Sequence, residues 1–255
     1  MENIYINKKQ VEQPKNAKKK VLDTKYIQFD HAKSVKLKTL NEVAKSLCQI
    51  KIKDKKNGTG FFLKINTSNN TLYMLVTAHH VVRYPYGDKK LEIEIITDVG
   101  NIKRKIKLDK NERKMIFLGK KESNNNSEKE TYDISGIEII GKDNLKDKVK
   151  FLDYDLNCRK KNYSNYKGKD TFILHHPNGI EDLTFSSGKI LEIKEHRSFS
   201  HSLDTDQGSS GSPILLIDNE SDNPKVIAIH TSADTSTNDT NIGLFINVLT
   251  RKLNE

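Results

Sequence analysis

Short alternating segments, separated by turn residues, constrain the fold of this chain more than any other feature. Between residues 58 and 247, apolar and polar side chains alternate over short stretches, and glycine, asparagine or charged turns separate these stretches. A period of two is typical of strands with one buried face, whereas helices need a period near 3.6. Helical periodicity is nearly absent from this range. The pattern predicts an all-β fold, either a sandwich or barrels.

The expected strands form two groups joined by the charged segment 143–168. Residues 121–130 are a low-complexity loop whose polar composition cannot form a core. The first group comprises residues 58–65, 71–77, 91–97, 102–108, 115–118 and 133–140, and the second comprises residues 171–174, 189–193, 198–203, 214–217, 226–230 and 242–247.

The start of the domain, residues 40–52, fits two patterns. Leu40, Val43 and Ala44 have helical spacing, whereas the following apolar residues, from Leu47 to Ile52, could begin a strand. The sequence leaves both open.

The first 38 residues differ in character from the rest. The chain has 44 Lys and Arg against 34 Asp and Glu, a net charge of +10, and Lys8, Lys9, Lys15, Lys18, Lys19 and Lys20 all lie near the N-terminus. Such a segment is typical of a solvated, disordered tail; contact with nucleic acid or an acidic partner is the alternative. We expect a basic, largely disordered arm over residues 1–38 and one domain over residues 39–255.

The two cysteines help to predict the cellular compartment of the protein. Cys48 and Cys158 are widely separated and lack the spacing of metal ligands, so free thiols are expected. No apolar signal segment is present, and no run approaches the roughly eighteen apolar residues of a membrane span. We therefore expect a cytoplasmic, intracellular protein with no membrane partner.

Because no His-Glu-x-x-His or Cys/His ligand pattern occurs, neither a metal nor another cofactor is expected.

A glycine- and serine-rich loop precedes the strand expected at residues 214–217. This loop, residues 206–213, contains the pattern Gly-x-Ser-Gly-Ser-Pro. It can expose one serine hydroxyl beside bent backbone whose N–H groups point to the same place, which a nucleophile with an oxyanion hole requires. The same residue types are common in ordinary turns, so the loop alone does not distinguish a nucleophile loop from a turn.

Two further motifs supply a base and a carboxylate. The sequence Thr-Ala-His-His-Val, from Thr77 to Val81, ends an apolar strand, and Asp133 begins the strand expected at residues 133–140. Strand ends commonly hold functional residues, although a lone histidine or aspartate there is more often structural. Their order, His then Asp then Ser, is that of the chymotrypsin-like triad and differs from the order in subtilisins and α/β-hydrolases.

Together the three motifs resemble those of the trypsin-like (chymotrypsin-fold) serine peptidases, over about residues 58–247. The resemblance implies two antiparallel six-stranded β-barrels of the chymotrypsin type, at about residues 46–142 and 169–247, with a connector at about 143–168. A short C-terminal helix is expected at about residues 248–254. The resemblance further implies a protein or peptide substrate bound between the barrels.

The resemblance also implies a role for each motif residue. The family pattern Thr-x-x-His-Val places the base three residues after Thr77, which selects His80 and leaves His79 in a variable position. Ser210 would be the nucleophile, His80 the base and Asp133 the group that orients the imidazole.

The backbone of the loop would supply the oxyanion hole, through the N–H groups of Gly208 and Ser210. The residue before the nucleophile is usually aspartate in this family, but here it is Ser209. This difference excludes an activation switch that uses that aspartate.

Three residues bear on specificity in opposite directions. Thr205 and His230 resemble the threonine and histidine with which glutamyl endopeptidases hold an acidic side chain, and both side chains can donate hydrogen bonds to a carboxylate. Asp204 occupies the position that makes trypsin select basic residues, and a carboxylate there would repel Glu or Asp. An acidic preference is the leading hypothesis; a basic preference, or a bracing role for Asp204 and Thr205, remains open.

Other histidines are expected to be structural. The segments 175–179 and 186–188 resemble landmarks of the second barrel, which gives His176 a structural role. His201 is expected at the surface, with a position lining the cleft as the alternative. The competing function for the whole chain is a non-catalytic or partner-regulated peptide-binding module, against which the presence of His80, Asp133, Ser210 and Gly208 argues.

Overall fold

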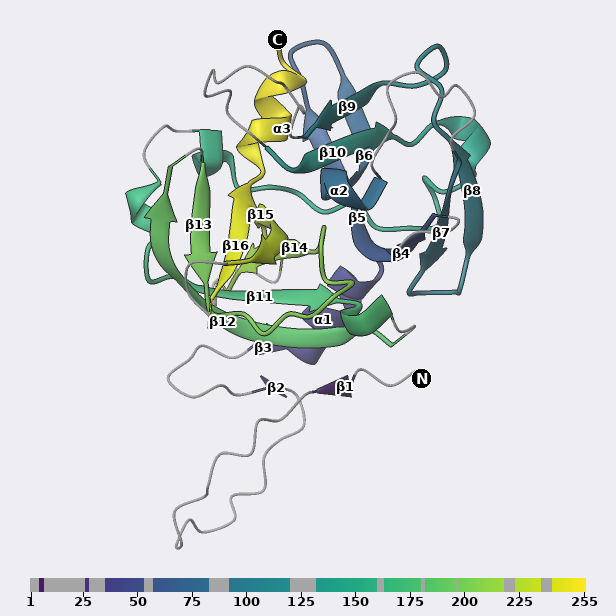
Figure 1. Cartoon of the computed structure of the whole chain (residues 1–255). Helices are drawn as coiled ribbons and strands as arrows, with labels where there is room; N and C mark the ends of the chain where they lie inside the picture. Colours follow the sequence, from purple (N-terminus) through teal and green to yellow (C-terminus); the bar gives the residue numbers. More distant parts are fainter. Residues whose placement is uncertain are drawn as a thin grey trace, which may run out of the picture.

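A computed structural model describes residues 35–52, 57–82, 92–119, 132–159, 163–179, 182–195, 197–217, 223–234 and 240–255, with the backbone of two short strands nearer the N-terminus, β1 (Tyr5–Ile6) and β2 (Tyr26–Ile27). Two seven-stranded sheets make up most of the fold (Figure 1). The expected low-complexity loop at residues 121–130 and most of the expected arm lie outside the described residues.

The first sheet has the strand order β8-β7-β4-β5-β6-β10-β9, and all its pairings are antiparallel. Within the described ranges no pairing joins β8 to β9, so this sheet is a half-barrel. Its strands are β4 (Leu47–Lys51), β5 (Gly58–Asn66), β6 (Thr71–Thr77), β7 (Glu92–Thr97), β8 (Lys103–Lys107), β9 (Met115–Leu118) and β10 (Ile134–Glu138).

The second sheet contains a closed barrel of six strands. Its order is β12-β11-β14-β15-β16-β13, and β13 pairs back with β12; β1 adds a parallel pairing to β12. The strands are β11 (Asp170–His175), β12 (Thr184–Lys194), β13 (Ser198–His201), β14 (Pro213–Leu216), β15 (Val226–Ala233) and β16 (Asn241–Phe245). The predicted double-barrel fold is confirmed.

Every strand expected from alternation is present; β6 and β9 have the expected ends, and the ends of the others are shifted. The largest shift is in β12, which begins at Thr184 because Ser186, Ser187 and Gly188 continue the pairing with β11 instead of forming a turn. Residues 40–52 hold both expected elements, since α1 (Leu37–Ala44) buries Leu40 and Val43 and β4 follows it. Helix α1, preceded by β3 (Val35–Lys36), begins within the expected arm.

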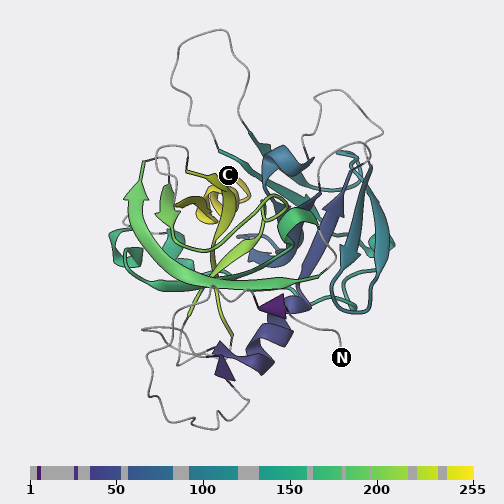
Figure 2. The same ribbon diagram turned by 60° about the horizontal axis from the view of Figure 1, so that its bottom comes forward.

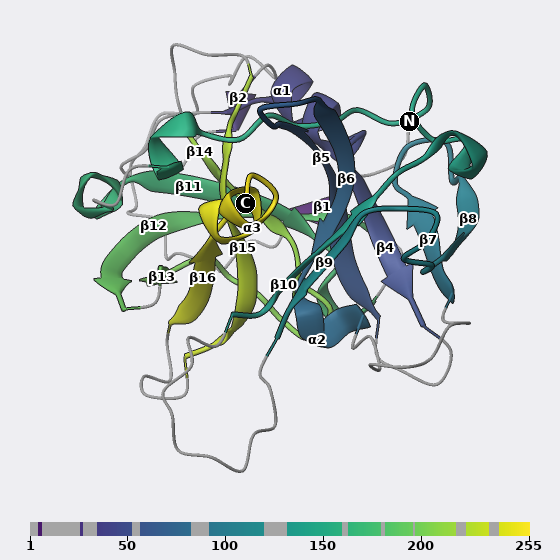
Figure 3. The same ribbon diagram turned by 90° about the horizontal axis from the view of Figure 1, so that it is seen from above.

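The helices of the described ranges are few and short. They are α1, α2 (His79–Val82), α3 (Asn247–Lys252) and the 3-10 turns η1 (Gly141–Asp143), η2 (Leu156–Arg159), η3 (Ser164–Tyr166) and η4 (Pro177–Gly179). The expected C-terminal helix, α3, lies near β10 and β16 (Figure 3), and a Cβ at Gly136 of β10 would lie 3.0 Å from Leu249 Cδ1. The N-terminal elements β1, β2, β3 and α1 lie on the opposite side of the molecule (Figures 1 and 2).

The connector binds both barrels along its length. The backbone N–H of Leu152 donates to Phe62 O of β5, and that of Asp155 donates to Val226 O of β15, each at 2.9 Å. These bonds fix the two barrels relative to one another. The site at their junction is therefore built on a rigid frame.

Both cysteines are free and buried, as expected for unpaired thiols. Burial raises the pKa of Cys158 to about 12 and that of Cys48 well above its usual value. Neither thiol is therefore a nucleophile at neutral pH. Over the described ranges, no helix has the length and apolar character to cross a membrane, and no group of three or more His, Cys, Asp or Glu could hold a metal ion.

Candidate active site

Helix α2 and the start of β10 bring His80 and Asp133 together. Strand β6, which α2 follows directly, pairs with β10 so that Thr77 faces Ser135. Asp133 Oδ2 lies 2.6 Å from His80 Nδ1, and Asp133 Oδ1 accepts the backbone N–H of His80 at 2.8 Å. One carboxylate thus fixes both the ring and the backbone of the histidine. With Nδ1 engaged, Nε2 is the nitrogen that can exchange a proton with a substrate or nucleophile.

The adjacent histidine, His79, is held in a different way. Its Nδ1 lies 3.0 Å from Ser135 Oγ, and its ring packs edge-on against Phe117. A Cβ at Gly119 would overlap this ring. Burial lowers the pKa of His79. These contacts fasten α2 to the sheet, whereas the ring of His80 is held by the carboxylate of Asp133.

The loop between β13 and β14 bends sharply at two glycines. Gly208 has φ +95° and Gly211 has φ +93°, which side chains other than glycine adopt at a cost. A Cβ at Gly208 would overlap the carbonyl oxygen of His176, and one at Gly211 would overlap that of Thr59. The loop therefore lies directly on backbone from both barrels, with Ser210 between the two bends.

Thr59 of β5 holds two carbonyl groups of this loop. Its hydroxyl donates to Gly208 O at 2.9 Å, and its backbone N–H donates to Ser210 O at 3.0 Å. Over the described ranges, the N–H groups of Gly208 and Ser210 have no acceptor. The two donors expected to form the oxyanion hole are therefore available.

Thr59 was not predicted as part of the site. In the sequence it stands in Gly-Thr-Gly, which suggests only a turn into a strand. The signal that could have identified it is a hydroxyl between two residues without side chains, where close backbone approach is allowed.

The hydroxyl of Ser210 is half-buried and donates to Thr231 O at 3.4 Å. No hydrogen bond joins it to His80 among the described residues. The two nevertheless come from adjoining segments, since a Cβ at Gly211 would lie 2.9 Å from the backbone nitrogen of Ala78, just before α2. Catalytic hydrogen bonds are often long in the absence of substrate.

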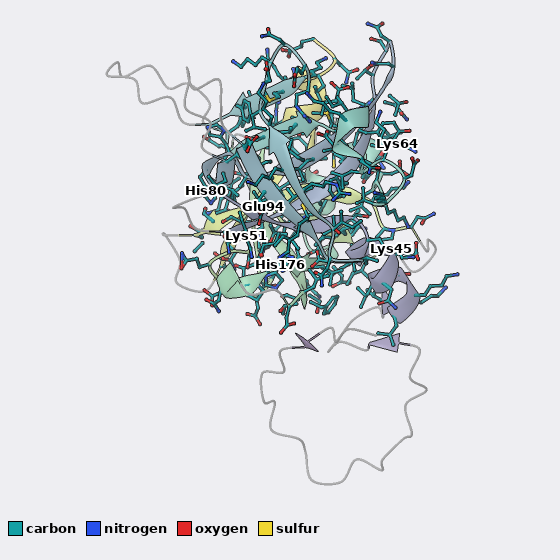
Figure 4. The ribbon with its side chains drawn as sticks, turned by 90° about the vertical axis from the view of Figure 1, so that its right-hand side faces the viewer. Lys45, Lys51, Lys64, His80, Glu94 and His176 are labelled. Carbon is teal, nitrogen blue, oxygen red and sulfur yellow. The ribbon has the colours of Figure 1, made fainter. Side chains whose placement is uncertain are left out.

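The segment after β11 ties the second barrel to the first. His176 Nε2 lies 3.1 Å from Asp98 Oδ1, with both side chains buried, and the backbone N–H of His176 donates to Thr59 Oγ1 at 3.1 Å. The Gln49 amide donates to Gly179 O at 2.7 Å. His176, which is labelled with His80 in Figure 4, thus has the structural role expected of it.

The expected surface position of His201 is wrong. His201 is fully buried in β13, and its Nε2 lies 3.3 Å from Nδ1 of His230 in β15. Burial lowers the pKa of His201 to about 3 and the pKa of His230 well below its usual value, so both rings are neutral at pH 7. The backbone of His230 lies beside the loop, because the N–H of Gly211, the residue after Ser210, donates to His230 O at 2.8 Å.

The two other specificity candidates lie before the loop. The side chain of Asp204 is exposed, and its backbone N–H donates to Ser186 Oγ at 2.8 Å, whereas Thr205 is half-buried. Water screens the charge of an exposed carboxylate, which therefore exerts a weak field on a bound ligand. Asp204 is thus exposed, whereas the side chains of His201 and His230 are buried.

Comparison with known proteins places the chain in a family. The family model described as the trypsin-like peptidase domain matches residues 58–229. A search of curated proteins finds no match.

Many solved structures share the fold. The Rv3671c protease of M. tuberculosis in its inactive form has a TM-score of 0.54 at 15% identity, covering 85% of this chain and 91% of that one. A Glu endopeptidase has a TM-score of 0.55 at 15% identity, covering 82% and 88%. The serine endoprotease of Yersinia pestis has a TM-score of 0.57 at 11% identity, covering 84% and 64%. At these identities the likeness shows the fold alone.

Proposed function

Because the chain belongs to the trypsin-like peptidase family, we propose that it is a serine endopeptidase in which Ser210, His80 and Asp133 act as a catalytic triad. The family and the fold support a serine protease in general. One observation supports the assignment of the triad: Asp133 binds both the ring and the backbone N–H of His80, beside a loop in which the N–H groups of Gly208 and Ser210 have no acceptor among the described residues.

In the first half of the proposed reaction, the Ser210 hydroxyl attacks the carbonyl carbon of the scissile bond, and its proton passes to Nε2 of His80. The N–H groups of Gly208 and Ser210 hold the resulting oxyanion. When the C–N bond breaks, the proton on His80 goes to the leaving amine, and Ser210 keeps the acyl group as an ester.

In the second half, water attacks the ester carbon and gives a proton to Nε2 of His80. The C–O bond to Ser210 then breaks, the acid product leaves, and the proton returns to the serine oxygen. In both halves His80 carries a positive charge transiently. Asp133 stabilises this charge through its bond to Nδ1, at 2.6 Å.

We further propose that the pocket prefers an acidic residue before the scissile bond. The support is the buried pair of His201 and His230, whose member His230 is bonded through its backbone to Gly211 of the loop, together with the exposed position of Asp204. A hydrogen bond between His230 Nδ1 and His201 Nε2 needs one proton. In the tautomer in which His201 donates it, the proton of His230 lies on Nε2, from which it can be donated to a substrate carboxylate.

Labelling with a fluorophosphonate probe tests catalysis. We expect the wild type to react at one serine, and Ser210→Ala and His80→Ala to remain unlabelled. Ser202→Ala is the matched control, because Ser202 is exposed and its hydroxyl accepts the backbone N–H of Lys189. If folded wild type is not labelled, the peptide-binding module becomes the better interpretation.

Cleavage of a peptide library tests the pocket. We expect cuts after Glu or Asp, and we expect His230→Ala to lower kcat/KM for a Glu substrate by about 10- to 100-fold, the effect of losing one hydrogen bond to a charged group. Cuts after Lys or Arg would contradict the acidic preference, and Asp204→Asn should then lower the activity instead. The intracellular location and any partner of the basic arm stay predictions.

A further inference from the structure

Behind the nucleophile loop, Ser209 and His175 form a buried pair. Ser209 is fully buried, and its Oγ lies 2.6 Å from Nδ1 of His175, the last residue of β11. The same Oγ accepts the backbone N–H of Asp206 at 3.0 Å. The side chain of Ser209 is thus tied to the interior of the second barrel, whereas that of its neighbour Ser210 is only half-buried.

Packing alone does not explain a histidine at position 175. Its Nε2 is buried and has no hydrogen-bond partner among the described residues. A buried polar atom without a partner costs about 1–3 kcal/mol, a cost that a leucine would not have. Burial also lowers the pKa of His175 to about 4, so the ring is neutral at pH 7. A leucine at position 175 could not form the hydrogen bond that joins Nδ1 of His175 to Ser209 Oγ.

The bond between His175 and Ser209 holds Ser209 in place, and Ser209 stands between Gly208 and Ser210, the two proposed oxyanion donors. The backbone of Ser209 closes a turn on each side, because its N–H donates to Asp206 O at 3.0 Å and its carbonyl oxygen accepts Ser212 Oγ at 2.7 Å. A rotation of Ser209 would therefore move the N–H groups of Gly208 and Ser210 together. Oxyanion donors are effective only when they already point at the developing charge.

We propose that His175 is a positioning residue, which holds the oxyanion hole in its active geometry through Ser209. The inference rests on the proposed function. It also gives a physical meaning to the serine that stands where the family usually has aspartate. A buried aspartate would need a cationic partner, whereas the neutral pair of Ser209 and His175 needs none. The second barrel thus holds its side of the loop through a neutral pair.

The kinetic test compares His175→Leu and Ser209→Ala with the conservative variant His175→Asn, whose amide can reach the position of Nδ1. We expect His175→Leu and Ser209→Ala to lower kcat by about 10- to 100-fold, which does not exceed the effect of losing a whole oxyanion donor. KM should change by less than about threefold. His175→Asn should recover most of kcat. Tyr166→Phe is the matched control, since it removes a partly buried hydrogen bond of the connector, from Tyr166 to Asp155.

Hydrogen exchange of the amides of residues 206–212 supplies a readout that needs no catalysis. We expect faster exchange in His175→Leu and Ser209→Ala and no change in Tyr166→Phe. Unchanged exchange, unchanged kcat or failure of asparagine to restore kcat would overturn the inference. A wild type that does not react with fluorophosphonate contradicts the proposed function, and the exchange comparison still decides whether His175 holds the loop. If the leucine variant does not fold, the smaller change in Ser209→Ala decides.

Discussion

The two barrels contribute differently built halves to the candidate site. In the first, His80 and Asp133 are partly exposed, at 40% and 33% of their side-chain surface, and a single carboxylate provides both hydrogen bonds. In the second, the loop around Ser210 is mostly buried and is held through several separate contacts, from Thr59, His175 and His230.

The difference follows from what each half must do. A base exchanges protons with serine, substrate and water, so its ring must remain accessible. An oxyanion hole must be rigid before the reaction begins, because donors that reorganise lose their advantage. We therefore expect the first half to depend on one residue and the second to tolerate the loss of single contacts better. The following variants test that contrast.

Asp133→Asn should have the largest effect. The amide cannot stabilise a charged imidazole and favours the wrong tautomer of His80, so we expect kcat to fall by about 10³- to 10⁴-fold with little change in KM. Steady-state hydrolysis of a peptide substrate measures this. The matched control is Asp109→Asn, which changes a partly exposed carboxylate of a first-barrel turn. A loss below about tenfold would show that His80 does not depend on Asp133.

Gly208→Ala should have the next largest effect. The added Cβ would overlap His176 O and lie 2.7 Å from the backbone nitrogen of Gly179, so the loop must shift. We expect kcat to fall by about 100-fold, the order of magnitude for losing one oxyanion donor.

Gly168→Ala separates this clash from backbone strain. Gly168 also has positive φ, at +76°, but no atom lies within 4 Å of its would-be Cβ. This variant should lose only about 1–2 kcal/mol of stability and retain its activity. Equal activity in the two variants would mean that the contact of Gly208 with His176 does not position the donors.

Local patterns of the sequence predicted much of the fold. Alternation located the strands because each buries one face, and the motif order selected His80, Asp133 and Ser210 as triad candidates because each motif lies at a strand end. Strand β1 was not predicted, since two residues are too few to show alternation. The start of β12 was missed because Ser and Gly indicate a turn unless pairing overrides them.

The supports of the site could not be predicted in this way. Thr59 binds Gly208 from 149 residues away, His175 binds Ser209 across 34, and His201 meets His230 across 29. Each of these pairs forms only when strands far apart in the sequence become neighbours. No periodicity or local motif encodes such a meeting, which is why His201 was placed at the surface.

The smallest expected effect is a pH dependence of the free energy of unfolding. It comes from the second half of the site. Three buried imidazoles lie on the side of the second barrel, those of His175, His201 and His230, and burial lowers the pKa of each. In the unfolded chain, histidine titrates near pH 6.5. As the pH falls below about 6.5, the unfolded chain therefore binds protons that the folded chain does not. Stability is lost as the pH falls toward about 4, and each histidine contributes at most about 1.4 kcal/mol per pH unit.

His201→Gln isolates one of these contributions. His201 faces the ring of His230, the ring of Phe199 and the backbone of Ile242, and its pKa of about 3 keeps it neutral in the folded state throughout the pH range 4.5–6. Urea unfolding in that range should give a free energy of unfolding that falls less steeply in the variant, by about 1 kcal/mol per pH unit. The slope is informative even if glutamine lowers stability at every pH. Equal slopes would mean that His201 is charged in the folded protein, and the buried pair with His230 would then not be the neutral donor that the proposed pocket needs.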